Sequence, residues 1–328
     1  MEYDAFRERI LEEIKVLLPD DVEDVISIPV TKNNGVVYDG ITIRDGSNIS
    51  PTIYLEPYFY QYLDGRSFDG VVSDIVKSYS DYRCEYDFDV KKILDWDYVK
   101  SHVVRRVVNY EQNREMLGHA PHIQVEDLAI VYQIVVSDMM DEQGYATIAV
   151  KDDFCEVWNV SLEELDETSK LNTRKILPPR MDSMATVFSE ATGVELQFLD
   201  EMNLYILTND LKINGAVHIL DAEVMKTIKE ELGESIYYVI PSSIHEVLII
   251  PYNEEYDSIY LESIINEVNE NELSDVDILS NHAYIIDATE GKFMLASKYE
   301  DYKIQQELKE KQKEMEKDLS EPEKKPKL

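Results

Sequence analysis

The sequence predicts an α+β protein with antiparallel sheets and interspersed helices. Amphipathic segments of helical period alternate with short β-branched runs, and several of these runs are joined by tight turns. No regular β-α-β spacing runs through the chain, which disfavours a doubly wound parallel sheet. The 328 residues include 44% hydrophobic side chains, enough for a sizeable core.

Length and composition predict two lobes and a tail. The expected N-terminal lobe covers residues 1–158 and the expected C-terminal lobe residues 159–298. Residues 299–328 are expected to form a charged helix with a sparse apolar stripe, followed by a flexible Pro/Lys tail.

The first lobe is expected to begin with a helix at residues 3–17, because Phe6, Ile10 and Ile14 recur on one helical face. Two β-branched runs flank Asn33-Asn34-Gly35, and Asn-Gly readily adopts the positive φ of a hairpin turn. A second helix is predicted at 67–79. Strands are predicted in this lobe from β-branched content at 99–110, 127–138 and 145–150.

In the second lobe, Ser161 and Glu164 form a capping box, which predicts that a helix begins there. Further helices are predicted at 221–232, closed by Gly233, and at about 257–270. Strands are predicted at 184–188, 204–208, 216–220, 236–240 and 245–251, with a hairpin at 283–295.

The formal net charge is −35, from 67 acidic and 32 basic residues. Nucleic-acid binding and docking on anionic membranes are disfavoured, because both depend on clusters of Lys and Arg. From Tyr299 onward there are 8 basic and 9 acidic residues, so nearly all the imbalance lies on the folded body. The charge fits a solvated surface. The alternative is attraction of a basic protein partner, or a role as a decoy for nucleic acid.

Two cysteines, Cys84 and Cys155, are too few and too far apart for a disulfide framework, and we expect reduced thiols. The acidic N-terminal segment lacks the features of a signal peptide, and no apolar run reaches the length of a membrane-spanning helix. A cytoplasmic location is therefore expected.

The sharpest candidate for chemistry is the segment Ser242-Ser243-Ile244-His245-Glu246, which brings hydroxyls, an imidazole and a carboxylate together in sequence. On an extended strand Ser243 and His245 stand roughly 6.6 Å apart along the chain, too far for proton transfer. A structural role is the favoured interpretation. The alternative is a hydrolase-type site in which His245 works with Ser242 or Ser243 and a distant carboxylate.

Signals for metals and cofactors are weak. His119 and His122 are separated by Pro121, and the Asp-x-Asp pairs are no more frequent than such an acidic composition predicts. The chain has no phosphate-binding glycine motif. We therefore expect no cofactor and no metal, the weaker alternative being a divalent-ion site in the acidic stretch 81–97.

Tyrosine is abundant at 22 residues, and four of them cluster with Phe59 at Tyr54, Tyr58, Tyr60 and Tyr62. Pro57 favours a helical turn in which Tyr58 and Tyr62 stack at i, i+4. Packing at the edge of the core is the favoured interpretation. A binding face, which would also use Asn34, is the alternative, since tyrosine is a common interface anchor.

Four segments carry a resemblance to known proteins: VTKNNGVVYDGITI, ISPTIYLEPYFYQYLDG, RRVVNYEQNREML and YYVIPSSIHEVLIIP. Over residues 1–298 the sequence resembles an uncharacterised bacterial family of acidic, intracellular proteins known only as a domain of unknown function. The resemblance implies no activity. It implies that shared features gather at the Asn-Gly turn, at Tyr54–Tyr62, at Asn109 and Asn113, and at Ser242–Glu246.

The function predicted from these observations is non-catalytic binding of another macromolecule. The absent catalytic motifs, the charged body and the tyrosine-rich segment support it. An enzyme is the less favoured class, and the oligomeric state is left open.

Overall fold

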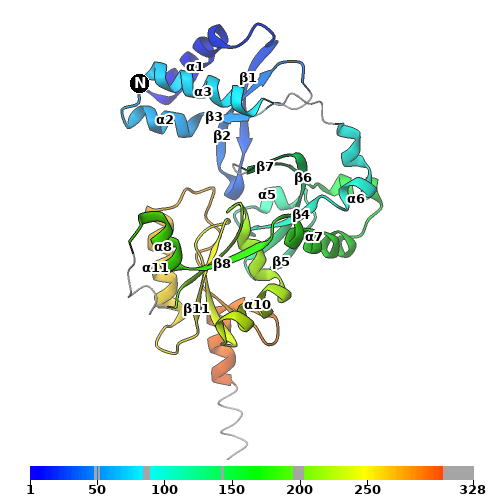
Figure 1. Cartoon of the computed structure of the whole chain (residues 1–328), viewed down its shortest axis with the longest axis vertical. Helices are drawn as coiled ribbons and strands as arrows, with labels where there is room; N and C mark the ends of the chain where they lie inside the picture. The colour runs from blue at the N-terminus through cyan, green and yellow to red at the C-terminus, as the bar shows by residue number, and fades with distance from the viewer. Residues whose placement is uncertain (48–49, 51, 84–88, 142–143, 195–202, 306–328) are drawn as a thin grey trace, which may run out of the picture. The chain divides into compact units, whose positions relative to one another are not determined.

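The structure is a computed structural model that describes residues 1–47, 50, 52–83, 89–141, 144–194 and 203–305 (Figure 1). It forms two compact units, Met1–Asp95 and Trp96–Leu328. The strands among these residues make three antiparallel sheets that alternate with helices, which confirms the α+β class. The boundary predicted at residues 158/159 lies inside the second unit, and Cys84 and the tail from residue 306 lie outside the described residues.

The first unit packs helices on one face of a three-stranded sheet ordered β1-β2-β3. Its core joins Phe6, Ile10 and Ile14 of the first helix to Ile41 and Ile43 of the central strand. Its elements are α1 (Tyr3–Leu17), β1 (Asp24–Thr31), η1 (Asn33–Gly35), β2 (Val37–Arg44), β3 (Thr52–Tyr54), α2 (Leu55–Leu63), α3 (Phe68–Tyr82) and η2 (Val90–Leu94).

The predicted hairpin is confirmed. β1 pairs with β2 from Asp24↔Arg44 to Thr31↔Val37. Asn34 and Gly35 both have positive φ, at 59° and 70°, as the turn requires. The two residues stand in a single 3-10 turn rather than a two-residue loop.

The second unit begins with a four-stranded sheet ordered β4-β6-β5, with β7 also pairing with β6. One edge strand, β4, is covered by helix α7. Thr173 of this helix accepts a hydrogen bond from the Arg105 backbone amide at 2.9 Å, and Asn172 donates to the Val103 carbonyl at 2.9 Å. Side chains thus satisfy strand groups that would otherwise be open for pairing with another chain. The elements are α4 (Trp96–Val99), β4 (Val103–Asn109), α5 (Arg114–Leu117), β5 (His122–Val125), β6 (Leu128–Asp141), β7 (Gly144–Ala149), α6 (Asp152–Trp158) and α7 (Leu162–Ile176).

The rest of the second unit is built on a six-stranded antiparallel sheet ordered β13-β12-β10-β11-β9-β8. One face is packed against η3 and α10, through buried residues such as Tyr237, Val239 and Ile249. The other face carries α11 and residues 296–305, which are helical. The elements are β8 (Pro179–Ser183), α8 (Met184–Thr192), β9 (Tyr205–Asn209), η3 (Gly215–Leu220), α10 (Ala222–Leu232), β10 (Ile236–Pro241), β11 (Val247–Pro251), α11 (Ser258–Asn271), β12 (Tyr284–Asp287) and β13 (Lys292–Leu295).

Two predicted strands are wrong. Residues 184–188 belong to helix α8, because Ser183 caps it by accepting from the Thr186 amide at 3.1 Å and Gly193 ends it at φ 70°. Residues 216–220 belong to the 3-10 segment η3, whose continuous burial mimics a buried strand. A Cβ on Gly215 would lie 2.6 Å from the Thr208 hydroxyl, so this segment approaches β9 as only glycine allows.

No helix among the described residues is long and apolar enough to cross a membrane.

A buried histidine in η3 makes stability depend on pH. His218 is 1% exposed and its Nε2 has no hydrogen-bond partner among the described residues. Burial lowers its pKa from 6.5 to about 4, against the opposing effect of a hydrogen bond to the Leu177 backbone. The unfolded chain therefore takes up a proton below pH 6.5 that the folded chain takes up only near pH 4.

We predict that His218 costs the folded state about 3 kcal/mol between pH 6.5 and 4, because protonation then favours the unfolded chain. Urea unfolding of the wild type and of His218→Gln should be compared at several pH values in this window. The stability of the wild type relative to the variant should fall as the pH falls. A pH-independent difference would contradict the prediction.

A second prediction concerns the buried ion pair of Arg105 with Asp166, whose side chains are 7% and 14% exposed. Tyr132 also donates to Asp166, at 2.9 Å. Asp166→Asn leaves the guanidinium charge buried without a counter-charge, and we expect a loss of about 3 to 5 kcal/mol in the free energy of unfolding. Asp74→Asn, which breaks the exposed Arg66–Asp74 pair, should cost under about 1 kcal/mol.

Candidate groove on the six-stranded sheet

A groove with a free volume of about 890 Å³ lies in the second unit, between α11 and the sheet face formed by β10 and β11. Its floor includes Ile240, Leu248 and Ile250. Ile240 pairs with Leu248 in the central strands of the sheet, yet all three side chains remain only half-buried. Among the residues that the structure describes, the helices that pack beside this part of the sheet face therefore do not cover it.

One wall of the groove is a stripe on α11 and the turn before it. Tyr256, Tyr260, Ile264 and Val268 recur every four residues and all line the groove. Their exposed fractions are 38%, 54%, 40% and 40%, which is high for large apolar side chains. The rings of Tyr256 and Tyr260 stack at a centroid distance of 6.4 Å. The stripe lies beside the core face of the same helix, which carries Leu261 and Ile265.

The described residues that line the groove carry no charge; its polar groups are hydroxyls and amides, as of Ser242, Asn253 and Asn269. The side-chain amide of Asn269 is already hydrogen-bonded within the fold: it donates to the Ser280 carbonyl at 3.0 Å and to Asn281. The groove thus offers an apolar surface with a small number of polar groups, as binding sites commonly do.

The stretch of chain that supplies most of the groove's lining has no positive side chains. Residues 230–291, which include β10, β11, α11 and β12, contain no Lys or Arg and fifteen acidic residues. The fifteen are Glu230, Glu231, Glu234, Glu246, Glu254, Glu255, Asp257, Glu262, Glu267, Glu270, Glu272, Asp275, Asp277, Asp287 and Glu290. An uncharged apolar surface therefore sits in a strongly negative field.

A lysine from the C-terminal helical segment approaches one end of the groove, but its charge is paired. Lys303 forms an ion pair with Glu254 and donates to the Tyr252 hydroxyl at 3.2 Å. Its Nζ lies 5.0 Å from the centre of the Tyr252 ring.

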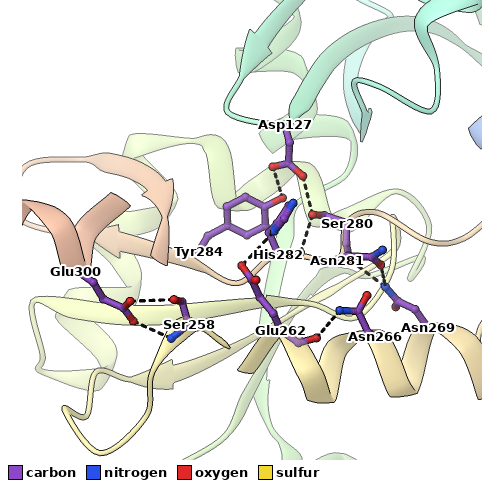
Figure 2. Close-up of polar contacts among 10 residues, drawn as sticks. All are labelled: Asp127, Ser258, Glu262, Asn266, Asn269, Ser280, Asn281, His282, Tyr284 and Glu300. Carbon is purple, nitrogen blue, oxygen red and sulfur yellow. Dashed lines mark hydrogen bonds and ion pairs between the residues drawn. The ribbon is translucent and has the colours of Figure 1, made fainter. Parts of the chain in front are cut away.

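The wall of the groove is fixed at both of its ends, as Figure 2 shows. At the N-terminal end of α11, Glu300 accepts hydrogen bonds from the amide and the hydroxyl of Ser258, at 2.7 and 2.9 Å. At the C-terminal end, the Asn269 amide binds the Ser280 carbonyl. The helix is therefore held by hydrogen bonds at both ends, beside the open part of the sheet.

The loop that contains Ser280, whose carbonyl accepts from Asn269, is itself held by a carboxylate of the four-stranded sheet. Asp127, in the turn between β5 and β6, accepts from the hydroxyls of Ser280 and Tyr284, both at 2.7 Å (Figure 2). Burial, and then the charge of Asp127, raises the pKa of Tyr284 well above its usual value, so this hydroxyl stays a donor.

Of the predicted segment Ser242–Glu246, Ser242 lines the groove and His245 does not. The ring of His245 contacts residues of neighbouring loops. Its Nδ1 accepts from the Asn214 amide at 3.1 Å, and its Nε2 lies 3.2 Å from Asp277. Since Nδ1 accepts, a neutral ring carries its proton on Nε2 and donates it to Asp277.

The serine hydroxyl next to His245 serves the backbone. Ser243 Oγ accepts from the His245 amide at 3.0 Å, and the Ser243 amide donates to the Glu246 carbonyl at 3.1 Å. These contacts describe a turn that leads into β11. They support the structural interpretation, while catalysis by His245 with Ser242 or Ser243 stays a prediction.

The tyrosine cluster lies in the first unit, where Pro57 stands in the first turn of α2. The four tyrosines make different contacts. Tyr54 lies under Lys32, Tyr58 hydrogen-bonds with Ser78, Tyr62 packs against Phe6, and Tyr60 is 64% exposed. These contacts favour packing at the core edge, and a binding role for this cluster and Asn34 stays a prediction.

Among the residues that the structure describes, no group of three or more His, Cys, Asp or Glu side chains is arranged to hold a metal ion. Within the acidic stretch 81–97, residues 84–88 fall outside this description. Asp97 forms an ion pair with Lys100.

A family model matches residues 3–288 of the chain. The chain belongs to the family of unknown function designated DUF5688. Comparison with curated proteins gives no match, and comparison with solved structures gives none either. Membership of this family confirms the resemblance to proteins of unknown function and assigns no activity.

The groove was missed in the sequence, although its helix was predicted. In the helix at 257–270, the apolar residues Tyr260, Leu261, Ile264, Ile265 and Val268 have the spacing of one ordinary core-facing stripe. The sequence therefore carries no signal that separates the buried Leu261 and Ile265 from the groove-lining Ile264 and Val268.

We predict that the Asp127 network contributes to stability as a unit, because each hydroxyl loses its acceptor when the carboxylate is removed. Asp127→Ala should lower the free energy of unfolding by about 1 to 3 kcal/mol, and Tyr284→Phe by a smaller amount. A double-mutant cycle should give a coupling of about 1 kcal/mol. Additive effects of the two substitutions would show that the hydrogen bond is not a source of stability.

Proposed function

We propose that this protein is a non-catalytic binding protein that takes up a basic, partly apolar segment of a partner protein in the groove beside α11. The observation that carries the proposal is an uncharged apolar groove within a stretch of 62 residues (230–291) that has no Lys or Arg. Apolar contact supplies the affinity, and the surrounding carboxylates select the sign of the partner's charge.

The groove is poorly equipped for catalysis. Its described lining residues include no His, Cys, Asp, Glu or Lys. General acid–base catalysis and activation of a nucleophile both need such groups within hydrogen-bond reach of the substrate. The hydroxyl of Ser242 has no base beside it in this set. Binding is therefore the function that these side chains support best.

The charge of the body favours a basic partner. The net charge is −35 and is carried by the folded residues rather than by the tail, whose 8 basic and 9 acidic residues nearly cancel from Tyr299 onward. Such a field attracts cations over roughly 10 Å at moderate salt and weakens as salt is added. Nucleic acids and anionic membranes are repelled by the same field.

The test uses a fluorescent peptide of about 14 residues built from Leu and Lys, with Leu on one helical face. Anisotropy should show saturable binding to the full chain that weakens about tenfold or more between low and high salt. Ile264→Asp, inside the groove, should weaken binding at least about tenfold, because it places a charge against the peptide's apolar face.

The matched control is Ile259→Asp, which adds the same charge to the same helix. Ile259 is 78% exposed and does not line the groove. This variant should bind the peptide as the wild type does. Equal binding by both variants, or binding indifferent to salt, would contradict the proposal.

A further inference from the structure

We infer that the segment bound in this groove is a single amphipathic helix of a partner protein, lying along α11 with its apolar face on the sheet and its Lys and Arg residues toward solvent. This inference rests on the proposed function and specifies the shape of the partner. It follows from the groups in the groove that a bound segment can contact.

The floor of the groove is the face of two inner strands of the sheet. β10 lies between β11 and β12, and β11 lies between β10 and β9. A segment that lies on this face meets side chains rather than a strand edge, so it does not extend the sheet as an extra edge strand. The edge strands β8 and β13 stand at the two ends of the sheet order.

A segment that lies on this floor must therefore form hydrogen bonds among its own backbone amide and carbonyl groups. Buried amide and carbonyl groups without partners are costly, and only a helix pairs all of them within one segment. A helix laid in an apolar groove is a common mode of peptide recognition, with anchors at i, i+3, i+4 and i+7.

The stripe on the wall gives the length of the partner helix. Its helical part, from Tyr260 to Val268, spans eight residues or about 12 Å along α11, and the ring of Tyr256 extends it by stacking on Tyr260 at a centroid distance of 6.4 Å. A partner helix of about 12 to 14 residues matches this span, and a neighbouring helix on a sheet face packs at about 10 Å from α11.

Carboxylates flank the stripe where the partner's basic residues would stand. Glu267 follows Ile264 by three residues and precedes Val268 by one, so it lies next to the stripe on the exposed surface of α11. Glu255, which is also exposed, precedes Tyr256 at the other end. Lys or Arg beside the apolar face of the partner helix would reach carboxylates at both ends of the wall.

The experiment compares three peptides of the same Leu and Lys content with the full chain. The first is amphipathic, the second has a scrambled order, and the third is the amphipathic peptide with one central residue replaced by Pro. Anisotropy gives the affinity, and far-UV circular dichroism of the mixture gives the helix content. The amphipathic peptide should bind and gain helix, and the Pro peptide should bind about a hundredfold more weakly.

Equal binding of the three peptides, with the loss in Ile264→Asp retained, would overturn the helical partner and leave the proposed function standing. No binding of any peptide would overturn both. Glu267→Lys should weaken binding of the amphipathic peptide more than Glu270→Lys does, since Glu270→Lys makes the same charge change further from the stripe. Equal losses would remove the assigned orientation.

Two other occupants would also overturn the inference. A peptide of residues 306–328 that displaces the probe at equal concentration would identify the chain's own tail as the occupant. Sedimentation could instead show a dimer of the full chain that the amphipathic peptide dissociates and that Ile264→Asp does not form. That result would identify a second copy of the chain as the occupant.

Discussion

The open groove depends on the hydrogen bonds that fix α11 at its two ends. Glu300 holds Ser258 at one end, and Asn269 holds the loop at Ser280 at the other. Leu261 and Ile265 bury the inner face of the helix against the sheet. A helix held only by apolar contacts could slide or tilt toward the uncovered strands, because apolar contact is not directional. The end contacts keep Ile264 and Val268 beside the groove instead of over its floor.

The two faces of the six-stranded sheet show how differently one sheet can be covered. On one face, η3 and α10 bury Tyr237, Val239 and Ile249 almost completely. On the other, Tyr238 is buried, while Ile240 and Ile250 in the same strand pair remain half-exposed. The continuous apolar runs of β10 and β11 predict burial on both faces of the sheet. The asymmetry arises from the positions of the covering helices.

Local signals predicted much of the fold, and contacts distant in sequence account for what they missed. The turn at Asn34-Gly35, the cap at Ser161 and the stop at Gly233 each act within a few residues, and all three are found. η3 was mistaken for a strand because its burial comes from β9 and the His245 loop. The groove was missed for the same reason: whether Ile264 faces solvent is decided by what covers β10 and β11.

The negative charge also bears on contact between the grooves of two copies of the chain. Two molecules that met groove to groove would bring two sets of fifteen carboxylates together without a single Lys or Arg between residues 230 and 291. Repulsion of this kind disfavours contact between two grooves. In the proposed binding role, apolar surface and carboxylates would act together: the first would bind many helices indiscriminately, and the second would restrict them to those that carry positive charge beside their apolar face.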